Sequence, residues 1–303
     1  MKNIIILSLV SFLLISCKPD KKQSQETESV NQFTFAFLTD IHLQPERNAT
    51  KGFRKAIAKV NEFNPDFVIT GGDLIMDALG VSYERADSLY TLYNEVSKDF
   101  QMPVHNTFGN HETFGVYKES GIEITHEEYN KKMFENRIGK RYYSFDHKEW
   151  HFIVLDAVGV KPERYYFGHI DDEQIAWLKS DLQKITKDTP IVISVHIPFI
   201  TSMTQLTKGS LEANEEGIVI TNARDVLLLL YEYNLKLVLQ GHLHFLEDIY
   251  VGNKTHFITG GAVSASWWEG PRGKMEEGFV LVKIKDDQLD WEYIDYGWEV
   301  AEN

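Results

Sequence analysis

Seven side chains in this sequence have the types and the spacing of ligands for metal ions. Each follows the end of an apolar, β-rich run, in segments that read TDIH, TGGDL, FGNHE, VHIP and QGHLHF. The seven are Asp40, His42, Asp73, Asn110, His196, His242 and His244. Carboxylates and imidazoles suit divalent Zn, Mn or Fe. Seven donors are too many for one tetrahedral ion, and they suit two ions about 3.5–4 Å apart that share a bridging group.

The segment QGHLHF places two histidines two residues apart behind Gly241. In an extended segment, residues i and i+2 point to the same side. We therefore expect His242 and His244 to present their ring nitrogens to one point in space. Glycines also precede Asp73 and Asn110. Without a Cβ atom they permit sharp turns and a close approach of the backbone to the ions.

The elements that must position these side chains can be read from the apolar runs. Short β-rich runs at residues 33–38, 66–70, 104–108, 190–195 and 235–240 predict strands that end just before the polar segments. Helical patterns at residues 50–63 and 83–98 separate the first three strands, which predicts an α/β domain with parallel strands. In open α/β sheets, sites form at the C-terminal ends of the strands, so we expect the seven side chains to converge there.

The rest of the chain predicts further elements around this centre. Residues 141–146 and 150–158 predict a hairpin, and residues 171–186 and 222–233 predict helices. Residues 112–140 are polar and irregular, which predicts an excursion over one rim. Four short strands are expected to be antiparallel and separated by GN, GG and DD turns, at residues 247–251, 254–259, 277–284 and 289–295.

Composition and charge limit the classes of function. The 303 residues are 43% hydrophobic, which is typical of a folded chain, and the net charge is −14. A nucleic-acid partner is not expected, because a phosphate backbone requires a basic face. A small phosphorylated substrate remains compatible with the negative charge, since bound metal ions reverse the sign of the local field.

The N-terminus predicts export. Residues 1–16 read as a signal peptide, because the uncharged run from Ile4 to Ser16 is too short for a comfortable membrane span. The segment LISC resembles the lipobox of bacterial lipoproteins, which predicts a lipidated Cys17. Cys17 is the only cysteine, so no intrachain disulfide is possible. The alternative is a plain signal peptide with an incidental cysteine.

The polar residues 17–31 then form a flexible tether, and residues 32–303 form the single folded domain. We expect a periplasmic or cell-surface lipoprotein whose contact with the membrane is the lipid anchor alone. The sequence leaves its oligomeric state open.

Five blocks in the order D-x-H, G-G-D, G-N-H-E, H and G-H-x-H resemble the calcineurin-like metallophosphoesterases. The resemblance spans Asp40 to His244. It implies a four-layer α/β/β/α sandwich of two mixed sheets flanked by helices. It also implies a ligand set in which one ion is held by Asp40, His42 and His244, the other by Asn110, His196 and His242, and both by the bridging Asp73.

The resemblance also implies a mechanism in which Asp73 and His111 are the catalytic residues. Two cations lower the pKa of a bridging water, and the resulting hydroxide attacks phosphorus. His111 would protonate the leaving oxygen, and a weaker hypothesis has Glu112 orient His111. Met76 stands where purple acid phosphatases carry a tyrosine, so two divalent ions (Mn, Fe or Zn) are expected rather than a ferric centre.

The predicted activity is metal-dependent hydrolysis of a phosphomonoester or phosphodiester. Three alternatives stay open: a 3′,5′-cyclic nucleotide phosphodiesterase, a non-catalytic envelope lipoprotein that binds a ligand, and a protein that stores or senses metal. In the segment SASWWEGPRGK, Trp267 and Trp268 are expected either to form a pocket wall or to lie in the core. Arg272 or Lys274 could meet a substrate anion.

Overall fold

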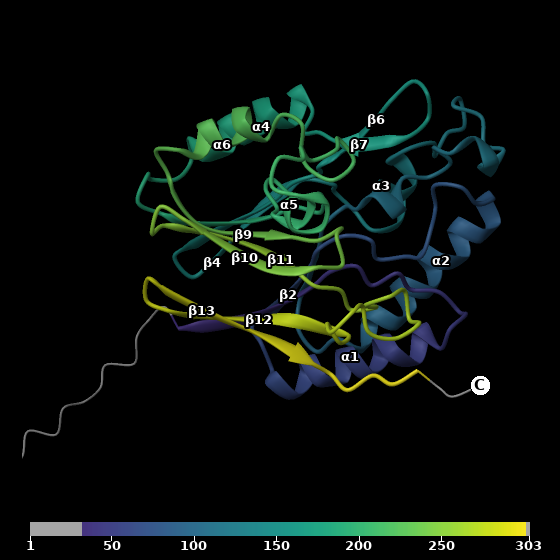
Figure 1. The fold of residues 1–303 in the computed structure, drawn as a ribbon, viewed down its shortest axis with the longest axis horizontal. Helices are drawn as coiled ribbons and strands as arrows, with labels where there is room; N and C mark the ends of the chain where they lie inside the picture. The colour runs from purple at the N-terminus through teal and green to yellow at the C-terminus, as the bar shows by residue number, and fades with distance from the viewer. Residues whose placement is uncertain (1–31, 301–303) are drawn as a thin grey trace, which may run out of the picture.

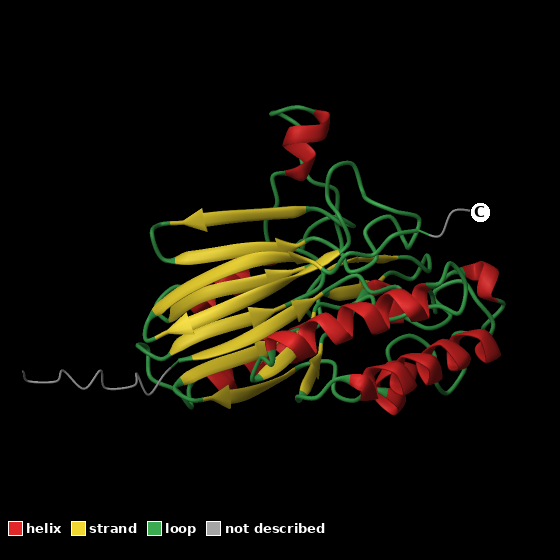
Figure 2. Ribbon diagram, turned by 90° about the horizontal axis from the view of Figure 1, so that it is seen from below, coloured by secondary structure: helices red, strands yellow, loops and turns green. Residues whose placement is uncertain are grey.

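The computed structural model describes residues 32–300, so the predicted signal peptide, Cys17 and the tether lie outside the described residues. Two large mixed sheets stack face to face, and helices cover their outer faces (Figures 1 and 2). This arrangement confirms the predicted four-layer α/β/β/α sandwich. Within this range, no helix combines the length and the apolar character that a bilayer crossing requires.

The first sheet has five strands in the order β13-β12-β1-β2-β3. β1, β2 and β3 are parallel, as predicted, and are linked by the helices α1 and α2. The bounds are β1 Phe33–Leu38, α1 Ala49–Phe63, β2 Phe67–Thr70, α2 Tyr83–Val96, β3 Val104–Asn106, β12 Gly278–Lys285 and β13 Gln288–Asp295. β1 lies at the centre of this sheet, because β12 pairs antiparallel with its other edge. α1 covers the outer face (Figure 1).

The second sheet has six strands in the order β10-β11-β9-β8-β5-β4. β5, β8, β9 and β11 are parallel, and β4 and β5 form the predicted hairpin. The helices α4 and α6 cover its outer face (Figure 1). The bounds are β4 Tyr143–His147, β5 Trp150–Val154, α4 Asp172–Leu182, β8 Pro190–Ser194, α6 Ala223–Leu230, β9 Asn234–Gln240, β10 Leu246–Val251 and β11 Thr255–Gly260.

The prediction for the last four strands is partly wrong. β10 pairs with β11, and β12 pairs with β13, both antiparallel as expected. β11 and β12 belong to different sheets, however, and the predicted GG turn at residues 260–261 instead begins a segment, residues 261–277, that crosses from one sheet to the other. β11 belongs to the six-stranded sheet because its other edge pairs parallel with β9.

Residues 112–140 are more ordered than predicted. They include a 3₁₀ helix at Lys118–Ser120 and the helix α3 at Lys132–Arg137. Phe114, Met133 and Phe134 are buried there, and burial of these side chains supplies the apolar contacts that hold the segment on the body. Three other short elements were also not predicted: β6 Val158–Val160, β7 Tyr166–Gly168 and α5 Met203–Lys208.

The space between the sheets is filled by aromatic and aliphatic side chains. Along β1, Phe33, Phe35 and Phe37 face the opposite sheet, while the alternate side chains face the helices, so both faces of the strand are buried. The rings of Phe35 and Phe67 stack with centroids 5.2 Å apart, and Phe152 meets Phe35 edge-on at 5.6 Å. This packing fixes the ends of the strands relative to each other, and the strand ends position the candidate site.

A close contact between α1 and Trp268 gives a testable consequence for stability. A Cβ atom at Gly52 would lie 2.3 Å from Trp268 Cζ3, and the indole is held in place because its N–H donates to the carbonyl oxygens of Ile41 and His42. Gly52→Ala gains about 0.5–1 kcal/mol of helix propensity. Overpacking costs about 1–3 kcal/mol, so we expect a net loss of up to about 2.5 kcal/mol in the free energy of unfolding.

Urea unfolding of Gly52→Ala beside Gly217→Ala measures this loss. At Gly217 an added methyl group meets nothing within 4 Å, which makes it the matched control. A Gly52→Ala protein as stable as the wild type would show that moving the indole costs no more than the helix propensity that the alanine gains.

Candidate metal centre

The five predicted segments converge at one end of the sandwich. Asp40 and His42 follow β1, Asp73 follows β2, and Asn110 opens the 3₁₀ helix Asn110–Glu112 after β3. From the other sheet, His196 follows β8, and His242 and His244 follow β9. All seven side chains predicted as ligands lie in this group, and they come from the C-terminal ends of parallel strands in both sheets.

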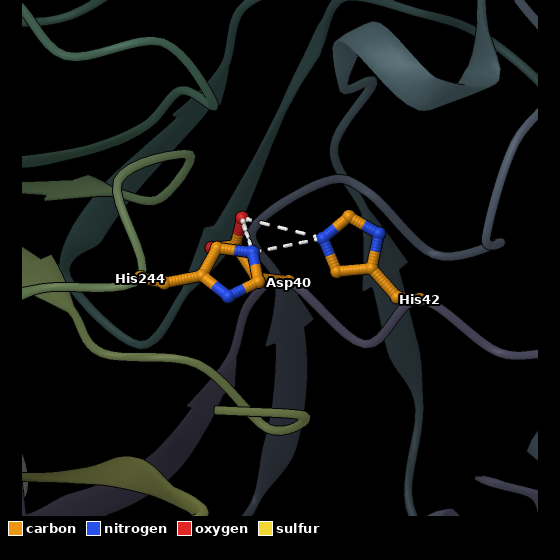
Figure 3. Close-up of side chains that lie close together, drawn as sticks. All are labelled: Asp40, His42 and His244. Atoms are coloured by element: carbon orange, nitrogen blue, oxygen red, sulfur yellow. Dashed lines mark hydrogen bonds and ion pairs between the residues drawn. The ribbon is translucent and has the colours of Figure 1, made fainter. Parts of the chain in front are cut away.

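The first cluster consists of Asp40, His42 and His244, which point toward one another (Figure 3). His42 Nε2 lies 2.9 Å from His244 Nε2, and Asp40 Oδ1 lies 3.4 Å from His244 Nε2. Asp40 and His42 come from the five-stranded sheet and His244 from the six-stranded sheet. Their ligand atoms lie within 4.8 Å of one another, which is the spacing of donors around a shared ion.

The second cluster is centred on Asp73 and His196. His196 Nε2 lies 3.1 Å from Asp73 Oδ2 and 3.0 Å from Asn110 Oδ1, and His242 completes the group. The same Asp73 Oδ2 lies 3.7 Å from His42 Nε2 of the first cluster. One carboxylate oxygen therefore stands between the two clusters, in the place that a bridging ligand would occupy.

The prediction that His242 and His244 would present nitrogens to one point is wrong. The two belong to different clusters, and neither lies in an extended segment, because their φ angles are 71° and 47°. Asp40, His42 and Asp73 also have left-handed φ angles of 54°, 46° and 51°. Such a conformation costs a non-glycine residue about 1–3 kcal/mol, and it persists where the surrounding structure holds it, as at functional sites.

Two of the glycines beside these ligands are required by close packing. A Cβ atom at Gly109 would lie 2.3 Å from both the backbone nitrogen and Oδ1 of Asp73. Gly72 has a φ of 90°, and its Cβ would lie 2.7 Å from His196 Nδ1. The expected close approach of backbone to the site is therefore present at both positions.

The outer ring nitrogens fit a set of metal ligands. His196 Nδ1 is 2.7 Å from the Gly71 carbonyl oxygen, His242 Nε2 is 2.8 Å from that of Gly217, and His244 Nδ1 contacts that of Ala265. Donation of an N–H to each carbonyl leaves the lone pair of the other nitrogen directed into the cluster, as in protein sites whose histidines bind metal. His42 is the exception, because its buried Nδ1 has no partner among the described residues.

Burial and mutual charge set the titration of this group. Burial raises the pKa of Asp40. It opposes ionisation of Asp73 as well, but His196 and His111 outweigh it and hold the pKa of Asp73 well below its usual range. Burial disfavours the charged form of His196, yet Asp73 raises its pKa to about 9. A ligand imidazole must be deprotonated, so the proton on His196 competes with a metal ion.

Glu112 joins two of the site loops rather than orienting the His111 ring. Its buried carboxylate accepts backbone N–H bonds from Asp73, Leu74, Ile75 and Gly109, at 2.7–3.2 Å. Burial raises the pKa of Glu112 to about 7. The ring of His111 is instead held by the Met76 carbonyl oxygen, which lies 2.5 Å from Nδ1. The weaker hypothesis for Glu112 is therefore wrong, because a different acceptor fixes the ring.

We expect Glu112→Gln to destabilise the protein. An amide NH₂ cannot accept the backbone N–H bonds that one carboxylate oxygen now accepts, and hydrogen bonds to a charged group contribute about 1.5–3 kcal/mol. Differential scanning calorimetry should show a Tm lower by about 5–10 °C. Glu163→Gln, at an exposed position, is the control. An unchanged Tm in Glu112→Gln would mean that the two loops keep their places without this carboxylate.

His111 lies at the rim of the centre, with its side chain 24% exposed. Its Nε2 lies 3.9 Å from Asp73 Oδ2, and its backbone N–H donates to Asp73 Oδ1 at 3.0 Å. The His111 ring also groups with His42 and Asp73 as a possible ligand set. Its partial exposure leaves the ring accessible to a molecule that enters the site.

The two tryptophans of SASWWEGPRGK divide between the two predicted roles. Trp268 is in the core, 1% exposed, whereas Trp267 lines the hollow above the candidate metal centre, where its ring centroid is 4.6 Å from that of His244. Arg272 lines the same hollow. Sequence reasoning missed three other lining residues, Tyr166, Met203 and Ile218, which lie in segments without a recognisable pattern.

A family model and two curated proteins that match this chain agree on the class of protein. Residues 33–246 match the family described as calcineurin-like phosphoesterase. A transmembrane protein with metallophosphoesterase domain from Danio rerio is 26% identical over 172 residues, which are 56% of this chain and 36% of that protein. A manganese-dependent ADP-ribose/CDP-alcohol diphosphatase from Homo sapiens is 24% identical over 229 residues, 59% of this chain and 63% of that protein.

The chain therefore spans about a third of one curated relative and just under two thirds of the other. Among solved structures, it is similar to a dimetal phosphatase from Danio rerio with a TM-score of 0.61. The identity is 16%, and the match covers 88% of this chain and 96% of that one. At this identity the likeness concerns the fold.

Proposed function

The chain belongs to the calcineurin-like phosphoesterase family, and from this premise we propose a metal-dependent phosphate-ester hydrolase with a two-ion centre. The proposed ligands of the first ion are Asp40, His42 and His244. Those of the second ion are Asn110, His196 and His242, and Asp73 is shared. The donors fit divalent Mn, Fe or Zn, and the name of the human relative supports manganese as the first ion to test.

The position of Asp73 is the observation that carries this proposal. Its Oδ2 atom lies 3.1 Å from a ligand atom of one cluster and 3.7 Å from a ligand atom of the other. A single ion would need only one of the two clusters. Two ions would need both, and a carboxylate shared by the clusters would hold the ions close together, as two-metal hydrolysis requires.

The residues of the chain then have distinct tasks. When bound, two divalent ions supply Lewis acidity, which lowers the pKa of a shared water and neutralises charge on phosphoryl oxygens. Asp73 accepts the backbone N–H of His111, and the Met76 carbonyl oxygen orients the ring by accepting the Nδ1–H. When the ring is protonated on both nitrogens, the Nε2–H faces the site, and His111 delivers that proton to the leaving oxygen of the ester.

One finding bears on the choice among phosphate esters, and a second bears on the choice between catalysis and binding. The human relative is named for hydrolysis of diphosphates, so a diphosphate belongs in the test beside monoesters, diesters and a 3′,5′-cyclic nucleotide. All seven predicted ligands and His111 are brought together. This arrangement favours catalysis over a binding or metal-storing role, which would not need His111.

The test is hydrolysis by the purified full chain after chelation and reloading with Mn, Zn or Fe. The substrates are p-nitrophenyl phosphate, bis-p-nitrophenyl phosphate, 3′,5′-cyclic AMP and ADP-ribose. We expect turnover that depends on the added metal, and the preferred substrate identifies the subclass. Two tightly bound ions without turnover of any substrate would contradict the proposal and favour a binding protein.

A further inference from the structure

A second cavity adjoins the hollow above the metal centre. Its volume is about 560 Å³, against about 210 Å³ for the hollow, and the two share four lining residues: Met203, Leu243, His244 and Arg272. A volume of this size accommodates an organic group of a nucleoside or sugar. A substrate whose phosphorus lies at the metal centre can therefore extend into this cavity without leaving the surface of the protein.

Two cations stand at this cavity without an anionic partner. Arg272 and Lys274 both line it, and neither forms an ion pair with any residue between 32 and 300. The Arg272 guanidinium lies 5.5 Å from the ring centroid of Trp267, beside the metal centre. In a chain of net charge −14, an unpaired guanidinium held next to a phosphoryl site is suited to bind a second phosphoryl group.

The remaining lining limits what can lie beyond that second group. Leu246, Met275 and Tyr293 offer apolar surface, and Glu276 and Asp295 offer carboxylates. Carboxylates repel further phosphate, but they accept hydrogen bonds from hydroxyl groups. A neutral group with hydroxyls and an apolar face, such as a ribose or another sugar, matches both kinds of lining.

We propose that the substrate is a diphosphate diester, with one phosphorus at the metal centre, the second phosphoryl group on Arg272, and a neutral nucleoside or sugar in the adjoining cavity. This inference rests on the proposed function. In the reaction, the oxygen of water bonds to the phosphorus at the metal centre, the anhydride P–O bond breaks, and the bridging oxygen leaves with the second phosphorus. His111 protonates this leaving oxygen, and a proton released by the attacking water replaces the proton that His111 has lost. The two products are phosphate monoesters.

The test compares the wild type with Arg272→Ala and Arg272→Lys. For each protein, kcat/KM is measured for ADP-ribose and for bis-p-nitrophenyl phosphate, which lacks a second phosphoryl group. We expect Arg272→Ala to lower kcat/KM for ADP-ribose, relative to kcat/KM for bis-p-nitrophenyl phosphate, by about tenfold or more. Arg272→Lys should lose less because the charge remains. Arg224→Ala, on α6 with a side chain 83% exposed, should leave the ratio unchanged.

Binding provides a readout that does not depend on turnover. Calorimetric titration with α,β-methylene-ADP should give a Kd about tenfold higher for Arg272→Ala than for the wild type. An equal fall of kcat/KM on both esters, or an unchanged Kd, would overturn the assignment of Arg272. Absence of metal-dependent turnover on every ester would instead overturn the proposed function, and the titration would still decide whether the diphosphate binds at Arg272.

Discussion

Replacing Asp73 with asparagine should lower kcat/KM for p-nitrophenyl phosphate by at least about 10³-fold. The structure places Asp73 Oδ2 between the two clusters, and Oδ1 accepts the backbone N–H of His111. An asparagine can keep the bond to His111, but it then turns an NH₂ group, which has no lone pair for a metal ion, toward the clusters. Loss of several kcal/mol of transition-state stabilisation corresponds to this factor.

Metal analysis tests whether the lost activity is accompanied by a lost ion. Inductively coupled plasma mass spectrometry should find about two ions per wild-type chain and one or fewer per Asp73→Asn chain. Asp225→Asn removes the same charge from an exposed position on α6 and should change neither quantity. Asp73→Asn protein with two ions and wild-type turnover would show that the carboxylate is not shared between them.

Replacing His111 with alanine should lower kcat by about 10²–10⁴-fold without loss of metal. The expected loss depends on the leaving group. An alkoxide needs the proton more than p-nitrophenolate does, so β-glycerophosphate should lose more turnover than p-nitrophenyl phosphate. His169→Ala, outside the centre, is the control for removal of an imidazole.

The His111→Ala variant also tests the alternative that this ring binds metal. His111 groups with His42 and Asp73 in the structure, so a ligand role predicts fewer bound ions in the variant. Equal losses for both leaving groups together with reduced metal content would make His111 a ligand rather than a proton donor.

Local signals in the sequence were sufficient to predict the parallel strands of an α/β domain and the set of side chains that meet, whereas the four-layer sandwich was implied by the family resemblance. Both depend on local signals: apolar runs predict strands, and the ends of parallel strands share one edge of a sheet. The family resemblance added which ligands belong together, and the grouping of Asp40 with His42 and His244 in space agrees with it. The roles of these residues in binding metal remain predictions.

Other features of the structure could not be predicted from local sequence patterns, because they depend on contacts between distant segments. The left-handed backbone at His242 and His244 depends on the surrounding loops, among them the Asp40 carboxylate that accepts the His242 backbone N–H. The crossing of residues 261–277 between the sheets depends on which strand edges are free, and that is a property of the whole fold. Trp267 and Trp268 lie in this crossing segment, so the burial of one ring and the exposure of the other to the hollow could not be predicted either.

The central place of β1 in the five-stranded sheet governs the order in which the chain can fold during synthesis. β1 leaves the ribosome early, but its second edge is completed only by β12, Gly278–Lys285. At about 5–20 residues per second, tens of seconds separate the two. Through that interval a strand bearing Phe33, Phe35 and Phe37 has an open edge, which favours aggregation. A chain that stops before residue 278 would keep all seven candidate ligands but leave this edge of β1 open, and we therefore expect it to be insoluble.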